Sequence, residues 1–442
     1  MSLDYTKLNR WLNIRKTTID KINKDLYHIL NCKIDLSSEN EVGDHAIKVL
    51  ADYLNIESDK IIKDNLKPSY LFKSKNEILK SKRAIFKDKI HFYNYYTLPT
   101  PSGYVAPVLL DILCPKEKLP KLNNGHLEPA VTISMGPNDI NARFHEKINK
   151  DTFIKFRINK NPKNNWIVGS SYFEPSFCKH SYSQCGEGLG RIISYTTKSF
   201  IENLSDGKLN DESYSNLVKK IDNSFPNRVM LKLEIENKGY TTDLISKKTN
   251  ITKIKIKNFF NNKKNKFDLK ILKEICKVIG SDYRLFQDKF FKEDSVGKLY
   301  YDYTDSVKSI RKFKSYTVAS IANSKRYPDL SGYFMKVKSN KKNVLDLFDS
   351  KCSHYYITGG KIIFNIKIKG KLEKVEASKD DCFWVSALTN HGFTGNGSIL
   401  KISDGQNLNY LEKEDLINTY KVKNVLKRAK GDMANWGYDS KK

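Results

Sequence analysis

Two histidines and one glutamate have the types and spacing of metal ligands in this sequence. Glu174 and His180 lie six positions apart in the aromatic run of residues 169–183, and His126 lies 54 positions before His180. Side chains an even number of positions apart on a strand project from one face, so Glu174 and His180 can converge if Pro175 does not bend the run. Two imidazoles and one carboxylate, with positions left open for substrate and oxygen, form the facial triad of non-haem Fe(II) oxygenases.

Two alternatives remain open from spacing alone. Glu128 lies two positions after His126 and would share its face on an extended strand, so it could replace Glu174 as the acidic ligand, although Pro129 follows it. The trio could also be a buried core histidine with unrelated surface residues. The glycine before His126 and the flanking aromatic residues bring the metal site level with that reading but do not decide between them.

A second histidine pair occurs later in the chain, at His354 and His391. Val385 stands six positions before His391, where the first region has Glu174. We therefore expect a second, metal-free site region whose role is to support the first and to donate side chains such as Lys401.

The elements that would position these residues alternate between two types. Helical periodicity dominates residues 1–65 and 226–290, and short β-rich runs separated by Pro, Gly and Asn dominate residues 90–195 and 354–402. This order predicts an α+β fold, a tandem duplication of a helical domain followed by a β-barrel. The predicted domains are residues 1–75 (helical), 76–205 (barrel with the metal site), 206–292 (helical), 293–410 (metal-free barrel) and 411–442 (C-terminal helix and tail).

The chain carries 78 Lys and Arg against 50 Asp and Glu, a net charge of +28 that favours anionic partners. Residues 241–252 resemble the first helix and turn of a helix-turn-helix, which suggests a DNA-binding regulator as an alternative function. Against it, the lysines are scattered with Asn and Ile throughout the chain, and the first helical region lacks a run of base-reading side chains.

Neither a signal peptide nor a membrane-spanning apolar run is evident, and the seven cysteines contain no Cys-x-x-Cys pair. We expect a cytoplasmic protein with reduced thiols.

Several segments resemble the hydroxyethylphosphonate dioxygenase and methylphosphonate synthase family. They are residues 123–130, 171–183, 8–16, 91–96 and 397–405. The resemblance thus covers nearly the whole chain. Members of this family are tandem cupins, each preceded by a helical domain, and the resemblance makes a homo-oligomer plausible.

The resemblance implies roles for individual residues. His126, Glu174 and His180 match the iron ligands, which leaves Glu128 as a neighbour; some relatives use a glutamine four positions after the first histidine, but Ala130 stands there. The positions that match substrate contacts are Lys16, Tyr95, Asn123, His180 and Lys401, together with Lys87, where the family has an arginine.

The implied reaction is the Fe(II)- and O2-dependent cleavage of the C–C bond of 2-hydroxyethylphosphonate. All four electrons come from the substrate, so 2-oxoglutarate is not required. The products are hydroxymethylphosphonate and formate, or alternatively methylphosphonate and CO2. The synthases have an aliphatic residue where we place Glu174, and a Phe where we place either Tyr355 or Tyr356. This difference favours hydroxymethylphosphonate and formate as products. We expect Tyr355 to be a catalytic residue. The implied partners are this phosphonate and O2, without membrane or nucleic acid.

Overall fold

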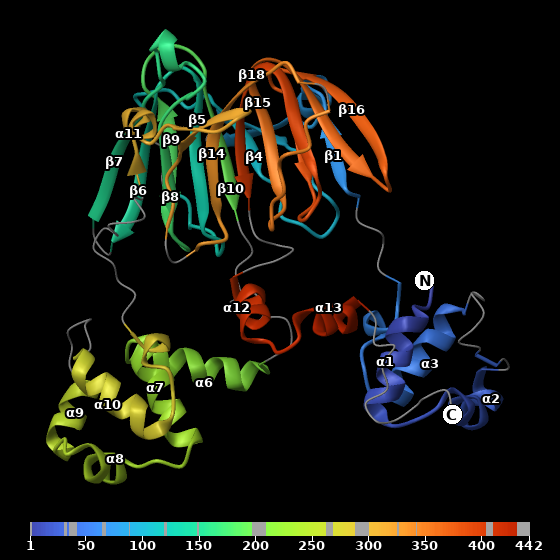
Figure 1. The fold of residues 1–442 in the computed structure, drawn as a ribbon. Coiled ribbons are helices and arrows are strands. Elements are labelled where there is room, and N and C mark those ends of the chain that lie inside the picture. Colours follow the sequence, from blue (N-terminus) through green and yellow to red (C-terminus); the bar gives the residue numbers. More distant parts are fainter. Residues whose placement is uncertain are drawn as a thin grey trace. The chain divides into compact units, whose positions relative to one another are not determined.

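The computed structural model describes most of the chain (Figure 1). The described residues are 2–30, 33–34, 42–63, 68–87, 89–118, 122–147, 150–196, 209–261, 268–287, 300–324, 327–341, 343–403 and 410–430. The chain divides into two compact units, one formed by residues 1–69 and 408–442 and the other by residues 70–407.

The first unit is helical. Asp4 caps α1 by accepting hydrogen bonds from the N–H groups of Thr6 and Lys7, and the helix ends at Lys16, which has a left-handed φ of 53°. Apolar side chains at helical spacing, such as Leu8 and Leu12, form its core. Its helices are α1 (Tyr5–Arg15), α2 (Ile19–Leu30), α3 (Asp44–Leu54), the 3-10 turn η1 (Ser58–Lys60), α12 (Tyr410–Asn418) and α13 (Val422–Lys430).

The second unit contains two large antiparallel sheets and one small one. The strand order of the first large sheet is β11-β8-β5-β10-β4-β3-β2, and that of the small sheet is β7-β6-β9. Their bounds are β2 (Arg83–Lys87), β3 (Ile90–Thr97), β4 (Val108–Ile112), β5 (Ala130–Pro137), β6 (Ile140–Lys147), β7 (Lys150–Phe156), β8 (Ser171–Glu174), β9 (Lys179–Gln184), β10 (Gly190–Thr196) and β11 (Tyr300–Tyr301). We call this pair of sheets the first barrel.

The second large sheet has the order β1-β17-β15-β18-β14-β13-β12, with β16 paired to β15. Its strands are β1 (Tyr70–Lys73), β12 (Arg311–Lys312), β13 (Tyr316–Ser320), β14 (Ser331–Ser339), β15 (Ser353–Ile368), β16 (Lys371–Ser378), β17 (Cys382–Val385) and β18 (His391–Ser403). We call this sheet the second barrel. Cupin-like sheets with separate helical segments make the molecule an α+β protein, as the sequence predicts.

The two barrels exchange their first strands. β1, which precedes the first barrel in the chain, pairs with β17 of the second, and β11, which precedes the second, pairs with β8 of the first. Each exchanged strand leads into a short helix with a capping box, α4 (Lys75–Lys80) after Ser74 and α11 (Tyr303–Lys308) after Asp302. β1 falls within residues 1–75, which we had predicted to be helical.

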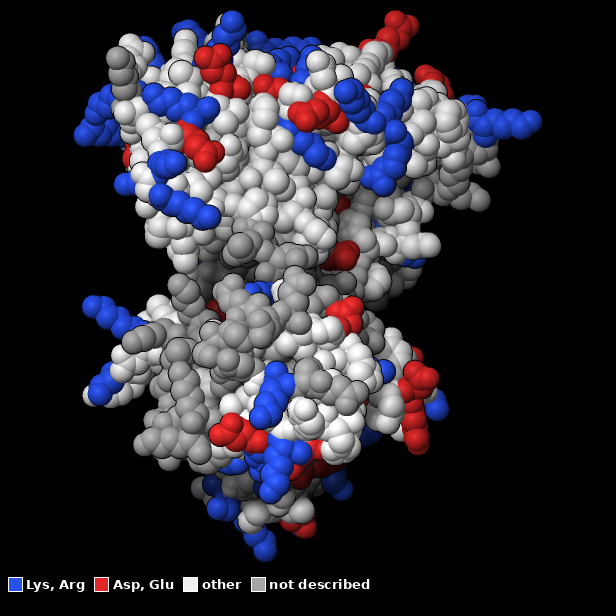
Figure 2. Space-filling model, turned by 90° about the vertical axis from the view of Figure 1, so that its right-hand side faces the viewer, with Lys and Arg blue, Asp and Glu red and all other residues white. Residues whose placement is uncertain are grey.

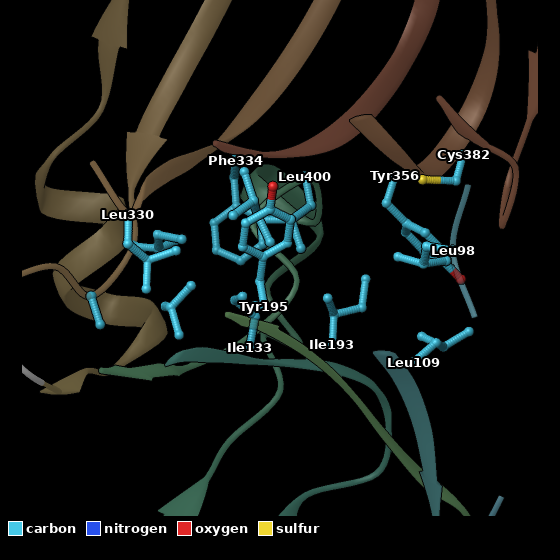
Figure 3. Close-up of a cluster of buried hydrophobic side chains, with 14 of the residues drawn as sticks. Leu98, Leu109, Ile133, Ile193, Tyr195, Leu330, Phe334, Tyr356, Cys382 and Leu400 are labelled. Atoms are coloured by element: carbon cyan, nitrogen blue, oxygen red, sulfur yellow. The ribbon is translucent and has the colours of Figure 1, made fainter. Parts of the chain in front are cut away.

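An apolar core lies between the two large sheets (Figure 3). His354 takes part in this contact: its Nε2–H donates to the Pro99 carbonyl (2.8 Å), and its Nδ1 accepts from the Tyr195 hydroxyl (3.1 Å). The labelled side chains are Leu98, Leu109, Ile133, Ile193 and Tyr195 from the first barrel and Leu330, Phe334, Tyr356, Cys382 and Leu400 from the second. Because these side chains join the barrels, the first five residues of β5 and of β15 are buried on both faces.

Residues 209–287 form a helical segment with its own apolar core. α8 and α9 meet at Asn250, whose left-handed φ of 57° makes the turn that the sequence suggests for a helix-turn-helix. The helices are α6 (Asp211–Asp222), α7 (Pro226–Asn237), α8 (Thr242–Thr249), α9 (Lys253–Asn261) and α10 (Leu269–Ile279), followed by the 3-10 turn η3 (Tyr283–Leu285). Among the helices that the structure describes, none is long and apolar enough to cross a membrane.

Candidate metal centre

Glu174, the last residue of β8, projects into the first barrel and is fully buried. Its Oε1 accepts short hydrogen bonds from the Thr132 hydroxyl (2.6 Å) and the Tyr182 hydroxyl (2.7 Å). Its Oε2 is also buried but has no hydrogen-bond partner in the described part of the chain. One carboxylate oxygen is therefore held by the protein, and the other is left for a ligand.

The two histidines face this second oxygen. His126 Nε2 lies 3.7 Å and His180 Nδ1 lies 3.4 Å from Glu174 Oε2. One potential ligand atom from each of the three residues falls within 4.8 Å of the others, the separation expected around one metal ion. Glu128 takes part through its backbone carbonyl, which accepts from His126 Nδ1 at 2.6 Å.

Backbone carbonyls fix how both imidazoles present their nitrogens. His126 Nδ1–H donates to Glu128 O, and His180 Nδ1–H donates to Cys178 O at 2.9 Å. This leaves Nε2 of each ring unprotonated, the form that binds a metal ion. The side chain of Asn123 lies against this edge, with its Nδ2 2.9 Å from His180 Nε2.

Two loops that contact each other hold His126 in place. The N–H of Phe177 donates to the His126 carbonyl at 2.8 Å. Gly125 has a φ of +75°, and a Cβ at this position would lie 2.8 Å from the backbone of Phe177. Only glycine fits so close an approach in that conformation. The glycine before His126, which we noted in the sequence, is thus explained by backbone contact.

The site has the electrostatics of a cation-binding site. Burial raises the pKa of Glu174, but His180, His126 and the two hydroxyl hydrogen bonds outweigh it and lower that pKa to about 2. The Glu174 carboxylate in turn raises the pKa of His126. The carboxylate is therefore ionised, and its free oxygen together with two imidazole nitrogens fits a divalent ion such as Fe(II).

The structure brings some of the expected substrate contacts to this centre. Asn123 Oδ1 accepts from the His180 N–H at 2.9 Å, so Asn123 both borders and braces the metal trio. Tyr95 lies on β3 and packs against the core of the first barrel, where burial raises its pKa. Lys16 lies in the first unit, and the side chain of Lys87 lies outside the described part of the structure, so their roles stay predictions.

The structure corrects the expectation for Tyr355 and Lys401. Both project into the second barrel, where the Tyr355 hydroxyl lies 2.7 Å from His391 Nε2 and the Lys401 ammonium pairs with Asp349. Tyr356 projects to the core between the sheets and donates to Asp380. These tyrosines and Lys401 therefore do not reach the metal trio. Both faces of β15 are buried, so alternation along the strand could not reveal which barrel each tyrosine enters.

Sequence reasoning missed Thr132 and Tyr182, the two hydroxyls that hold Glu174. Tyr182 lies two positions after His180 on β9, and Thr132 lies on β5 opposite β8. Tyr182 shares a face of β9 with His180, two positions earlier, which was an available signal; Glu174 ends a different strand, β8, so its even spacing from the other two was not a guide to its direction.

Comparisons with known proteins agree with this geometry. Residues 79–197 match a family model described as the 2-hydroxyethylphosphonate dioxygenase cupin-like domain. The chain is 34% identical over 452 aligned residues to the 2-hydroxyethylphosphonate dioxygenase of Streptomyces viridochromogenes, and the alignment covers 100% of both chains.

Solved structures give the same result. A variant of hydroxyethylphosphonate dioxygenase superposes with a TM-score of 0.80 and 33% identity, covering 97% of this chain and 100% of that one. A cadmium complex of PhpD with its hydroxyethylphosphonate ligand has a TM-score of 0.78, 33% identity and the same coverage.

Proposed function

Because this chain belongs to the 2-hydroxyethylphosphonate dioxygenase family, we propose that it cleaves the C–C bond of 2-hydroxyethylphosphonate with Fe(II) and O2, giving hydroxymethylphosphonate and formate. The chain is an oxidoreductase of the dioxygenase class. Its family membership displaces the alternative of a DNA-binding regulator.

The observation that carries the proposal is the buried Oε2 of Glu174, which has no hydrogen-bond partner among the residues that the structure describes and faces two imidazoles. An ionised carboxylate oxygen buried in this way is costly unless a cation binds it. His126, Glu174 and His180 would hold Fe(II) and leave coordination positions open. When bound, Fe(II) supplies the redox chemistry with O2 and a binding point for the hydroxyl and phosphonate oxygens of the substrate.

The other residues of the site hold these ligands and exclude water. Thr132 and Tyr182 keep Oε1 of Glu174 in place, so that Oε2 alone points to the metal. Phe144 stacks on Tyr172 at a centroid distance of 4.0 Å, and its ring lies 6.3 Å from that of His180. This aromatic wall lowers the local polarity and strengthens the electrostatic interactions inside the barrel.

We propose that Asn123 and Tyr95 bind the phosphonate group, with Lys16 and Lys87 as cationic partners. The support is the position of Asn123 beside His180 and that of Tyr95 at the core of the same barrel. An amide N–H, a phenol O–H and lysine ammonium groups all donate to phosphonate oxygens, and the charged donors form the stronger bonds.

Hydroxymethylphosphonate is the proposed product because Glu174 stands where the related synthases have an aliphatic residue. Tyr356 packs in the core between the sheets and Tyr355 in the core of the second barrel, so the choice of product rests on Glu174. Methylphosphonate with CO2 is the alternative product.

The ligand assignment is tested by replacing each ligand with alanine and measuring iron content and O2 consumption. His126→Ala, Glu174→Ala and His180→Ala should each lose bound Fe(II) and turnover. Glu128→Ala is the matched control, because the hydrogen bond that Glu128 makes to His126 comes from its backbone carbonyl, which the substitution keeps. A Glu174→Ala enzyme with normal iron content, or a Glu128→Ala enzyme without iron, would overturn the assignment.

We also propose that the chain is a tandem duplication of one helical plus barrel unit, with boundaries near residues 76, 206, 293 and 411. Its support is the matching placement of β1 with α4 and of β11 with α11 before the two barrels.

A further inference from the structure

The second barrel holds a buried polar cluster at the positions that match the metal ligands of the first. We propose that this cluster is a converted metal centre, in which the Lys401 ammonium and the Tyr355 hydroxyl take the bonds that an ion makes in the first barrel. The inference uses the first barrel's metal site as proposed above.

His391 occupies the position of His180. His180 pairs with Phe144 on β6, and His391 pairs with Ile366 in the corresponding half of β15. In each barrel the imidazole Nδ1–H donates to the carbonyl two positions earlier, Cys178 O at 2.9 Å and Thr389 O at 2.7 Å.

Asp349 occupies the position of His126. The first barrel has an exposed Phe177 with a φ of 59°, whose N–H donates to the His126 carbonyl at 2.8 Å. The second has an exposed Leu388 with a φ of 58°, whose N–H donates to the Asp349 carbonyl at 2.6 Å. A bulky residue with positive φ is rare, so its recurrence with the same hydrogen bond identifies corresponding loops.

Val385 occupies the position of Glu174. It lies three positions before Leu388, as Glu174 lies three before Phe177, and it pairs with the first residue of β15, as Glu174 pairs with the first residue of β5. The acidic ligand is therefore replaced by an apolar side chain of the same strand.

The two barrels differ in the size of one cross-strand pair of residues next to the ligand positions. Thr132 pairs with Ser194 in the first barrel, and Tyr355 pairs with Lys401 at the same place in the second. The small hydroxyl residues of the first barrel leave room above them, whereas the long side chains of Tyr355 and Lys401 extend toward the ligand positions.

Lys401 and Tyr355 bond the two polar residues that remain at ligand positions, Asp349 and His391. The Lys401 ammonium, only 5% exposed, forms an ion pair with Asp349, and its Nζ lies 5.1 Å from the Tyr333 ring centroid. The Tyr355 hydroxyl is 2.7 Å from His391 Nε2, and the same nitrogen of His180 is the one that its Nδ1–H bond to Cys178 O leaves unprotonated in the neutral ring. One buried cation balances one half-buried carboxylate, so the cluster needs no divalent ion.

Stability measurements test the role of Lys401 without any metal. Lys401→Met leaves the half-buried Asp349 carboxylate without its cation, with only the Lys351 N–H and the Ser353 and Ser403 hydroxyls among its described partners, so the melting temperature should fall by roughly 5 °C or more. Adding Asp349→Leu should recover at least half of that loss. Lys338→Met, an exposed lysine on β14, is the control and should melt like the parent. A Lys401→Met protein that melts like the parent would overturn the proposal.

Cobalt(II) binding by the full chain tests the correspondence itself. The parent should bind one equivalent, and His126→Ala should bind none. Four further substitutions in the His126→Ala protein should restore one equivalent of bound cobalt: Asp349→His, Tyr355→Thr, Val385→Glu and Lys401→Ser. Leaving out Val385→Glu should weaken the restored binding at least tenfold. The proposed conversion would be contradicted if the variant with all these substitutions folds but binds no cobalt. It would also be contradicted if the parent binds a second equivalent of cobalt that His126→Ala does not remove. A parent that binds no metal would refute the proposed function, while the stability measurements would still judge the role of Lys401.

Discussion

The two oxygens of Glu174 have different partners, and this difference explains most of the site's chemistry. Oε1 is held by two hydroxyls, and Oε2 lies between two imidazoles without a hydrogen bond from any described residue. The carboxylate is therefore oriented before any ion arrives. Preorganisation of this kind raises metal affinity because the ligand need not be immobilised on binding.

Removing the hydroxyls that hold Oε1 should weaken metal binding without removing a ligand. We expect Thr132→Val and Tyr182→Phe each to lower Fe(II) affinity by roughly tenfold to a hundredfold. Competition of Fe(II) with a chelator measures the effect. Ser181→Ala, at a buried serine beside Tyr182 on β9, is the control and should keep the parent's affinity. Unchanged affinity in both hydroxyl variants would contradict the orienting role.

Gly125 provides a second test at this scale. Gly125→Ala would place a Cβ 2.8 Å from the Phe177 backbone, so the loop that carries His126 must shift. We expect at least a tenfold loss of kcat/KM together with weaker iron binding. Gly103→Ala is matched to it, because Gly103 also has a positive φ (81°) but nothing within 4 Å of the added atom. If both variants lose kcat/KM and iron binding equally, the cause is backbone strain at a positive φ, and the contact with Phe177 is not responsible.

The residues of the metal trio could be predicted because their types suit a metal ion and because the surrounding segments resemble a known family. The misplaced residues, Tyr355 and Lys401, share a different feature. They lie on strands buried on both faces, where apolar alternation gives no sign of which barrel a side chain enters. Spacing along the chain also could not separate Glu174 from Glu128, since that choice depends on how two loops meet.

At the scale of elements, the sequence predicts the order of helical and β-rich segments but not the exchange of β1 and β11 between the barrels. These strands are four and two residues long and pair with strands far away in the sequence. So short a strand has too little alternation to detect. The exchange and the core between the sheets together tie the barrels into one body of packed strands.

The histidine between the sheets predicts how stability depends on pH. Burial lowers the pKa of His354 to about 3, from a usual value near 6.5. As the pH falls below about 6.5, His354 binds a proton in the unfolded chain but stays neutral in the folded chain. The free energy of unfolding therefore decreases progressively down to about pH 3. At pH 4 the loss is at most roughly 3 kcal/mol for this residue.

We expect His354→Gln to flatten this dependence. Its amide can still donate to Pro99 and accept from Tyr195, but it does not titrate between pH 7 and pH 4. Urea unfolding at several pH values should show a smaller loss of unfolding free energy for the variant than for the parent. Parallel curves for the two proteins would exclude His354 as a source of the pH dependence.

At the scale of the whole molecule, the net charge of +28 is the feature that least constrains the function. Lys and Arg are spread among Asp and Glu over the face shown in Figure 2 and do not gather into one patch there. A dispersed charge of this kind supports solubility and attraction of anions in general. The specific chemistry resides in a few buried side chains of the first barrel.

The most direct test of the central claim is phosphorus NMR of a single reaction. The chain is reconstituted with Fe(II) without oxygen, given 2-hydroxyethylphosphonate, and then exposed to O2, with His180→Ala as the inactive control. We predict that the substrate signal is replaced by that of hydroxymethylphosphonate as formate accumulates. A methylphosphonate signal would contradict the assigned product, and an unchanged substrate signal with iron bound would contradict the dioxygenase function itself.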